Sequence, residues 1–174
     1  MGNRTARIVV ALVTIVIAII GIYSYTQPSS FPPSPADQTP ITTTPLPLNG
    51  LTPGDPAAII SGDNPATITT PPMRYAYAAI LKIPTDLKSA GRAWVKIAIK
   101  VKQGKFAISL LSDDAQKIVT QQVFSVTPNI INITFFEMSL TDVGLILFSN
   151  SQDVDGTASV AELSSVKISY NSQP

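Results

Sequence analysis

The sequence predicts an all-β domain, an antiparallel β-sandwich, preceded by one transmembrane helix and a disordered Pro/Thr-rich linker. Three observations carry this prediction. An uncharged apolar run lies near the N-terminus, a proline-rich stretch follows it, and alternation of apolar and polar residues then begins. The predicted parts are residues 1–26 for the cytoplasmic stub and helix, 27–65 for the linker and 66–174 for the sandwich.

The apolar run covers residues 8–25 and contains no charged residue. A helix of about 20 apolar residues crosses a bilayer core, and roughly 17 is the lower limit. Arg4 and Arg7 precede the run, and the next basic residue is Arg74. The positive-inside rule therefore places the N-terminus in the cytoplasm. We expect a single-pass anchor in the cell membrane, with the lipid bilayer as partner of residues 8–25 and the C-terminal domain outside the cytoplasm.

A cleaved signal peptide is the alternative for the same run. Cleavage needs small residues just before the cut, whereas Tyr23 and Tyr25 crowd that position. The run is also longer than the usual apolar core of a signal peptide. The sequence therefore favours an uncleaved anchor.

The predicted linker is defined by its composition. Residues 27–72 hold 12 of the 15 prolines and no Lys or Arg. Such a stretch buries too little apolar surface to offset the entropy cost of ordering it. Proline-rich chains are extended, semi-rigid spacers, so we expect a stalk, with an unselected tether as the alternative. A first strand is predicted at Ala66–Thr69, where proline becomes sparser.

Period-2 alternation marks the strands that follow. The clearest strand is Arg92–Val101, and Gln103–Gly104 then forms a tight turn into Lys105–Leu111. Further strands are predicted at 73–81, 116–126, 129–136, 143–149 and 165–170, with a short helix as an alternative at Thr141 or at 160–163. Seven or more short strands in about 100 residues predict a sandwich.

The composition excludes several function classes. The chain has no Cys and no His, which excludes disulfides, thiol nucleophiles, Cys/His zinc sites and histidine acid–base catalysis. A net charge of +1 gives no nucleic-acid footprint. The acidic residues are scattered over turns and strand ends, with no pair suited to glycoside hydrolysis. We therefore expect a protein that is not an enzyme.

Trp94 is the only tryptophan, and the alternation puts it on the side of its strand opposite the core. An exposed ring can stack on a sugar, and polar neighbours can bind its hydroxyl groups. Arg92, Trp94, Lys96 and Lys100 therefore form a candidate glycan-binding platform. The alternative is that Trp94 packs under another segment and that the lysines are merely solvated.

A second candidate site lies in the turn Asn150–Gly156. Asp153 and Asp155 with the turn glycine are oxygen ligands of the kind that Ca²⁺ prefers. The spacing departs from an EF-hand, because a third acidic or amide ligand in register is absent. A structural Ca²⁺ at this turn is one interpretation and a plain polar turn is the other. No other cofactor is expected.

The strand pattern also resembles a known group of domains. A glycine-led hairpin of the form G-x-x-x-I-x-L-L is followed by an acidic turn, and later by an asparagine turn and a last strand with alternating Val and Ile. The matching residues are Gly104, Ile108, Leu110, Leu111, Asp114, Asn150, Val166 and Ile168. This pattern, over residues 73–171, is similar to jelly-roll domains of the galactose-binding and carbohydrate-binding-module type.

The resemblance implies a non-catalytic binding module for a glycan or an envelope component. Sandwiches of this type host many roles, so the fold alone does not decide the function. The alternative is an assembly subunit that pairs through a sheet face or edge, with an envelope protein as partner and without sugar binding.

Overall fold

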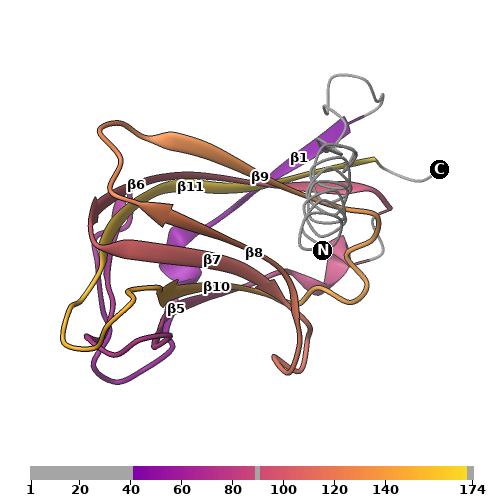
Figure 1. Cartoon of the computed structure of the whole chain (residues 1–174). Coiled ribbons are helices and arrows are strands. Elements are labelled where there is room, and N and C mark those ends of the chain that lie inside the picture. The colour runs from indigo at the N-terminus through magenta and orange to yellow at the C-terminus, as the bar shows by residue number, and fades with distance from the viewer. Residues whose placement is uncertain (1–40, 89–90, 172–174) are drawn as a thin grey trace, which may run out of the picture. The chain divides into compact units, whose positions relative to one another are not determined.

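The computed structural model describes residues 41–88 and 91–171. These residues form two antiparallel sheets that pack face to face and share one hydrophobic core (Figure 1). The predicted antiparallel β-sandwich is thus confirmed. The anchor predicted at residues 8–25 lies outside the described residues. Within the described ranges, no helix has the length and apolar character needed to cross a bilayer.

The first sheet has six strands. In spatial order it contains β3 (Ile59–Ser61), β4 (Ala66–Thr69), β11 (Val160–Asn171), β6 (Ala93–Gln103) and β9 (Ile131–Glu137), and β1 (Ile41–Leu46) pairs with β11. The first half of β11 pairs with β4 and its second half with β1, while β6 runs along its other side. The border strands of this sheet are therefore β3 and β9, and β1, which pairs only with β11, also has a free edge.

The second sheet has five strands. In spatial order it contains β2 (Thr52–Pro53), β5 (Tyr77–Lys82), β10 (Leu145–Asn150), β7 (Lys105–Leu111) and β8 (Ile118–Ser125). Two short 3₁₀ helices, η2 (Leu48–Gly50) and η3 (Thr85–Leu87), lie in connections. Because β8 and β9 follow each other in the chain, the border strands of the two sheets lie on the same side of the sandwich (Figure 1).

The core is built from the alternating apolar residues that the sequence predicts. On β6 these are Ala93, Val95, Ile97, Ile99 and Val101, all at most 1% exposed. Phe106 and Phe148, from neighbouring regions of the second sheet, lie with ring centroids 6.3 Å apart. Burying each of the Val, Ile and Phe side chains contributes about 1.5–3 kcal/mol of transfer free energy.

The predicted linker extends too far. Residues 41–65, assigned to it, contain β1, β2 and β3. The threonine-rich β1 has β-branched residues suited to a strand, and its Thr43 hydroxyl bonds the Ser169 hydroxyl at 2.9 Å. Leu46, at the end of β1, is buried in the core. Proline is tolerated here because β1 and β2 lie at sheet borders, where a missing N–H breaks no ladder.

Two strand boundaries also differ from the prediction. Residues 160–163 belong to β11 and not to a helix, because they pair with β4 on one side and β6 on the other. The strand predicted at 73–81 starts only at Tyr77. The residues before it form a turn in which Tyr75 has a φ of 61°. The sequence carries no alternation signal strong enough to separate that turn from the strand.

Asn150, at the end of β10, joins three segments through its side chain. It is fully buried, and its Nδ2 lies 3.0, 3.1 and 2.9 Å from the carbonyl oxygens of Pro71, Met73 and Thr157. Its Oδ1 accepts the Ser159 hydroxyl at 2.9 Å. These bonds hold the segments before β5 and before β11 against the end of the second sheet.

Candidate binding site

Trp94, the central residue of the predicted glycan platform on β6, is not accessible to a ligand. Trp94 does lie opposite the inter-sheet core, as predicted, but it has 0% exposed surface. Its ring packs against Phe136, its register partner on β9, with centroids 5.4 Å apart. The expectation of an exposed stacking ring was therefore wrong, because strand alternation decides which side a residue faces and not whether that side is covered.

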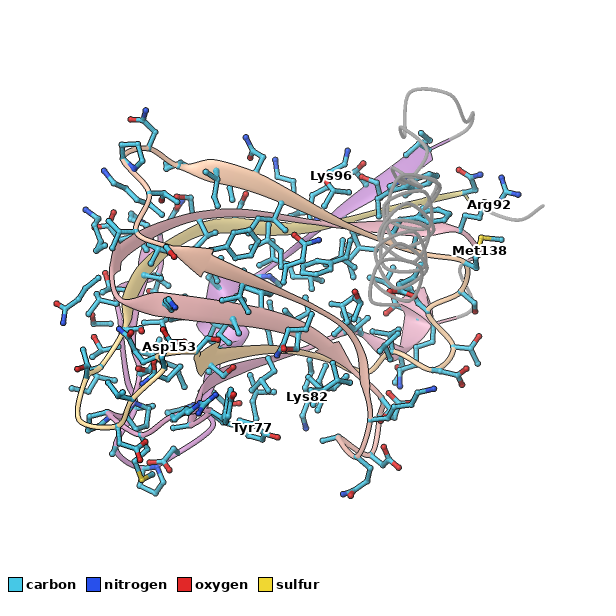
Figure 2. The ribbon with its side chains drawn as sticks, in the orientation of Figure 1. Tyr77, Lys82, Arg92, Lys96, Met138 and Asp153 are labelled. Atoms are coloured by element: carbon cyan, nitrogen blue, oxygen red, sulfur yellow. The ribbon has the colours of Figure 1, made fainter. Side chains whose placement is uncertain are left out.

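The basic residues of the predicted platform lie along the same strand. Lys96 is half-buried on the outer side of β6, and Arg92 is exposed just before this strand (Figure 2). Lys100 is also half-buried and lies on the same side of β6 as Lys96. Lys100 lies opposite Glu162 of β11 in the sheet register. Glu162 forms a salt bridge of 2.9 Å with Lys102. These side chains form a partly neutralised polar face, without an exposed ring among them.

The two carboxylates of the predicted calcium turn are engaged with protein groups. Asp153 forms a salt bridge with Lys105, and this contact lowers the pKa of the Asp153 carboxyl. Asp155 accepts the backbone N–H of Arg74 at 2.7 Å. Within residues 41–88 and 91–171, no group of three His, Cys, Asp or Glu side chains could hold a metal ion. Calcium at this turn stays a prediction, and the polar-turn interpretation agrees with these contacts.

A cavity of about 570 Å³ lies at the other end of the sandwich, where both sheets reach their border strands. Met138, which lines it, and Asp153 are at opposite ends of the domain (Figure 2). The lining residues come from the β7–β8 turn, the start of β8, the end of β9 and the loop after it: Ser112, Asp114, Lys117, Val119, Phe136, Glu137, Met138, Ser139, Asp142 and Val143. The sequence analysis did not predict that these residues form one site.

The β7–β8 turn that forms one wall is held by its own side chains. Asp114 accepts the Ser112 hydroxyl at 2.5 Å and the Gln116 backbone N–H at 3.0 Å, and these bonds lower the pKa of its carboxyl. The Ser112 hydroxyl accepts the Lys117 N–H at 3.0 Å. Both bonds go to Oδ1 of Asp114, so this oxygen is engaged within the turn.

The second wall approaches the first through Gly144. A Cβ at this position would lie 2.6 Å from the Cα of Asp113, closer than real Cβ atoms approach other atoms. The Gly144 N–H donates to the Leu111 carbonyl at 2.9 Å, and its carbonyl accepts the Ile83 N–H at 2.9 Å. A glycine is therefore required where the β7–β8 turn and the strand β10 meet beside the cavity.

Glu137 is the half-buried acidic residue of the cavity, and its carboxylate is available to accept hydrogen bonds from a ligand. Burial raises the pKa of its carboxyl above the ordinary value, because the charged form loses solvation. Within the described residues its carboxylate has no hydrogen-bond or salt-bridge partner. The strand β9 holds it in place, with Phe136 beside it and Ala93 of β6 opposite it in the register.

Comparisons with known proteins agree with the architecture. No protein-family model matches the chain, and no curated protein sequence is significantly similar to it. Among solved structures, a family 29 carbohydrate-binding module from Piromyces equi has a TM-score of 0.55 and 11% identity, over 76% of this chain and 92% of that chain. A structure described as a family 4 carbohydrate-binding module has a TM-score of 0.51 and 19% identity, over 70% and 85%.

A third similar structure is the CBM36-1 domain of a multidomain xylanase from the hindgut metagenome of Trinervitermes trinervoides. Its TM-score is 0.53 at 7% identity, and the match covers 76% of this chain and all (100%) of that domain. At such identities the likeness is one of fold. The resemblance noted in the sequence is confirmed: the described part of the chain has the jelly-roll β-sandwich fold of carbohydrate-binding modules.

Proposed function

We propose that this protein is a non-catalytic glycan-binding module and that its binding site is the cavity between the border strands β8 and β9. The observation that carries the proposal is Glu137, a half-buried carboxylate without an internal partner in a cavity of about 570 Å³. The shared fold with carbohydrate-binding modules supports the choice of ligand class.

The size and lining of the cavity suit a small polar ligand. Ligand pockets usually measure roughly 300–1,000 Å³ and combine apolar walls with a few polar groups that orient the ligand. Here Val119, Phe136 and Val143 are the apolar part, and carboxylates and hydroxyls are the polar part. A sugar presents both an apolar ring face and hydroxyl donors, which matches this mixture.

The hydrogen-bonding capacity of the cavity points to hydroxyl donors in particular. Ser139 bonds the Thr141 hydroxyl at 2.7 Å, so it is engaged in its own loop as Asp114 is. Glu137 and Asp142 have no such partner within the described residues. An ionised carboxylate only accepts hydrogen bonds, and a bond to a charged acceptor is worth about 1.5–3 kcal/mol.

The charge of the cavity narrows the ligand class further. Asp114, Glu137 and Asp142 face one basic residue, Lys117. A polyanionic glycan would meet net repulsion here, since like charges in a partly desolvated site disfavour each other. A neutral oligosaccharide avoids this cost, so the proposed ligands are neutral glycans.

Replacing Glu137 by glutamine is expected to weaken binding of a neutral glycan about tenfold, because the charged acceptor becomes a neutral one. The measurement is isothermal titration calorimetry with xylohexaose and cellohexaose, with an oligogalacturonate as the acidic comparison.

In contrast to glycan affinity, the free energy of unfolding should rise in Glu137→Gln at pH values where the Glu137 carboxyl is ionised. Because burial raises the pKa of Glu137, its contribution to the free energy of unfolding is fully present below the unfolded pKa and is lost as pH rises through the folded pKa.

The matched control is Glu162→Gln, a carboxylate on β11 that pairs with Lys102 away from the cavity. That variant should bind as the original protein does. Unchanged affinity in Glu137→Gln would remove the cavity as the site. Failure of both neutral glycans to bind, or release of new reducing ends from them, would contradict the proposed function itself.

We also propose that the domain is held outside the cytoplasm by a single-pass anchor at residues 8–25. The support is the uncharged apolar run behind Arg4 and Arg7. The full chain is expected to remain in the membrane fraction after carbonate extraction, and a chain lacking residues 1–26 to become extractable. Added protease should reach the domain from the outer side of intact cells. A native chain already lacking residues 1–26 would show a cleaved signal peptide instead.

A further inference from the structure

The two border strands on one side of the sandwich carry almost no charge. The chain has 12 Lys and Arg and 11 Asp and Glu, yet none of them lies between residues 118 and 136. This stretch contains all of β8, the loop after it, and β9 up to its last residue. This uncharged stretch therefore forms the free edges of both sheets on one side of the sandwich.

Large apolar side chains are exposed along the same border. They are Ile118, Val123, Val126 and Ile130, with 52%, 51%, 57% and 53% of their surface accessible. A border strand presents a row of unpaired N–H and C=O groups that another strand can use. Proteins usually block such edges with lysine, proline, strong bulges or very short strands.

The border strands β2 and β3 have these protections, whereas β8 does not, and β9 carries a charge only at its last residue, Glu137. The border strand β2 has two residues and contains Pro53, and β3 has three residues. By contrast, β8 has eight residues and contains no proline and no charged residue. A register shift between Leu110 and Leu111 affects only its first residues, so the rest of β8 pairs regularly with β7.

We infer that β8 is a self-association edge, at which two copies of this chain pair their β8 strands antiparallel and join their five-stranded sheets. The occupant is a second copy because of charge. Two identical edges with Lys, Arg, Asp or Glu would place like charges opposite each other, which is destabilising. The neutral edge of β8 removes this obstacle, and a two-fold contact is the commonest arrangement of identical chains.

The faces of the sheet limit the register to two-fold axes that pass through a residue of β8, and we place the axis at Gln122, in the middle of the strand. Gln121 and Val123 lie on the outer face, since they pair with Ser109 and Ala107 of β7, and Gln122 lies on the other face. In a two-fold pair, residues that oppose each other must point to the same face. A two-fold axis at Gln122 meets this condition and places Gln121 of one copy opposite Val123 of the other. The two Gln122 amides then face each other, and each amide is both donor and acceptor.

The test uses the full chain, which contains no cysteine, so a single introduced thiol reports on one position. Directly opposed residues of an antiparallel pair have Cβ atoms about 4.5–5.5 Å apart. Mild oxidation of Gln122→Cys is therefore expected to give a disulfide-linked dimer at micromolar concentration. The control is Ser61→Cys, an exposed residue of the border strand β3, which should cross-link only at the rate of random collision.

A charge on the edge provides the second arm. Val123→Lys should raise the dimer dissociation constant roughly tenfold or more in sedimentation equilibrium, because two lysines enter one neutral interface. Ser61→Lys, with the same added charge, should leave it unchanged. Cross-linking at Gln122→Cys no faster than at Ser61→Cys would overturn the inference, and so would a dissociation constant unaffected by Val123→Lys. Neither result bears on glycan binding, which is measured separately.

Discussion

Replacement of Asn150 by alanine is expected to lower the free energy of unfolding by about 3–5 kcal/mol. The side chain is fully buried, and its two N–H groups are shared among the carbonyl oxygens of Pro71, Met73 and Thr157. Alanine would remove these bonds and the bond from the Ser159 hydroxyl, each worth about 0.5–1.5 kcal/mol. It would also leave the Thr157 carbonyl without this donor, whereas the Pro71 and Met73 carbonyls keep the Thr70 hydroxyl and the Ala76 N–H. The measurement is urea unfolding of the variant and the original protein, followed by circular dichroism.

A second substitution at the same position separates hydrogen bonding from packing. Asn150→Asp preserves the shape but replaces the donating amide by an acceptor, so it should destabilise the fold nearly as much as alanine does. The control is Asn132→Ala, an exposed residue of β9, which should change stability by no more than about 0.5 kcal/mol. A loss below about 1 kcal/mol in Asn150→Ala would show that the three contacts do not hold these segments together.

Replacement of Trp94 by alanine should cost about 3–5 kcal/mol of unfolding free energy, the usual range for removing a large buried aromatic side chain. The ring has no exposed surface and packs against Phe136, which lines the cavity. An exposed sugar platform would instead lose affinity without losing stability. Thermal unfolding and glycan titration of the same variant therefore distinguish the two roles.

Two control substitutions test whether the loss of stability in Trp94→Ala comes from the buried aromatic contact. Trp94→Phe keeps an aromatic contact with Phe136 and should recover most of the stability. Tyr77→Ala removes an exposed aromatic, 45% accessible on β5, and should cost much less than Trp94→Ala. Wild-type stability in Trp94→Ala together with weakened glycan binding would restore the original interpretation of Trp94 as a stacking ring. In the original protein Trp94 is also the only tryptophan, so its fluorescence reports on its own burial.

Much of the sandwich is encoded locally. The alternation along β6 and β7, the turn at Gly104 with its φ of 77°, and the start and end of β7 all follow from residue order. These features depend on period-2 placement of apolar side chains and on one glycine, both of which are visible in a short window of sequence. Composition also excluded cysteine and histidine chemistry without any knowledge of the fold.

Composition was misleading where neighbouring strands decide the outcome. Residues 41–65 have the proline content of a linker, yet β1 and β3 pair with distant β11 and neighbouring β4. Residues 160–163 become part of a strand because they pair on both sides. The pairing of β1 with β11 joins segments more than a hundred residues apart, and a local pattern carries no information about it.

The sequence by itself determined the fold class, the inward-facing side of the main strands and the absence of cysteine and histidine chemistry. Only the tertiary structure decided which candidate residues are accessible. It covers Trp94, engages Asp153 and Asp155 with protein groups, and gathers Asp114, Glu137 and Asp142 around one cavity. The physical reason is that strand alternation sets a direction for each side chain, whereas burial and proximity depend on the segments that pack beside it.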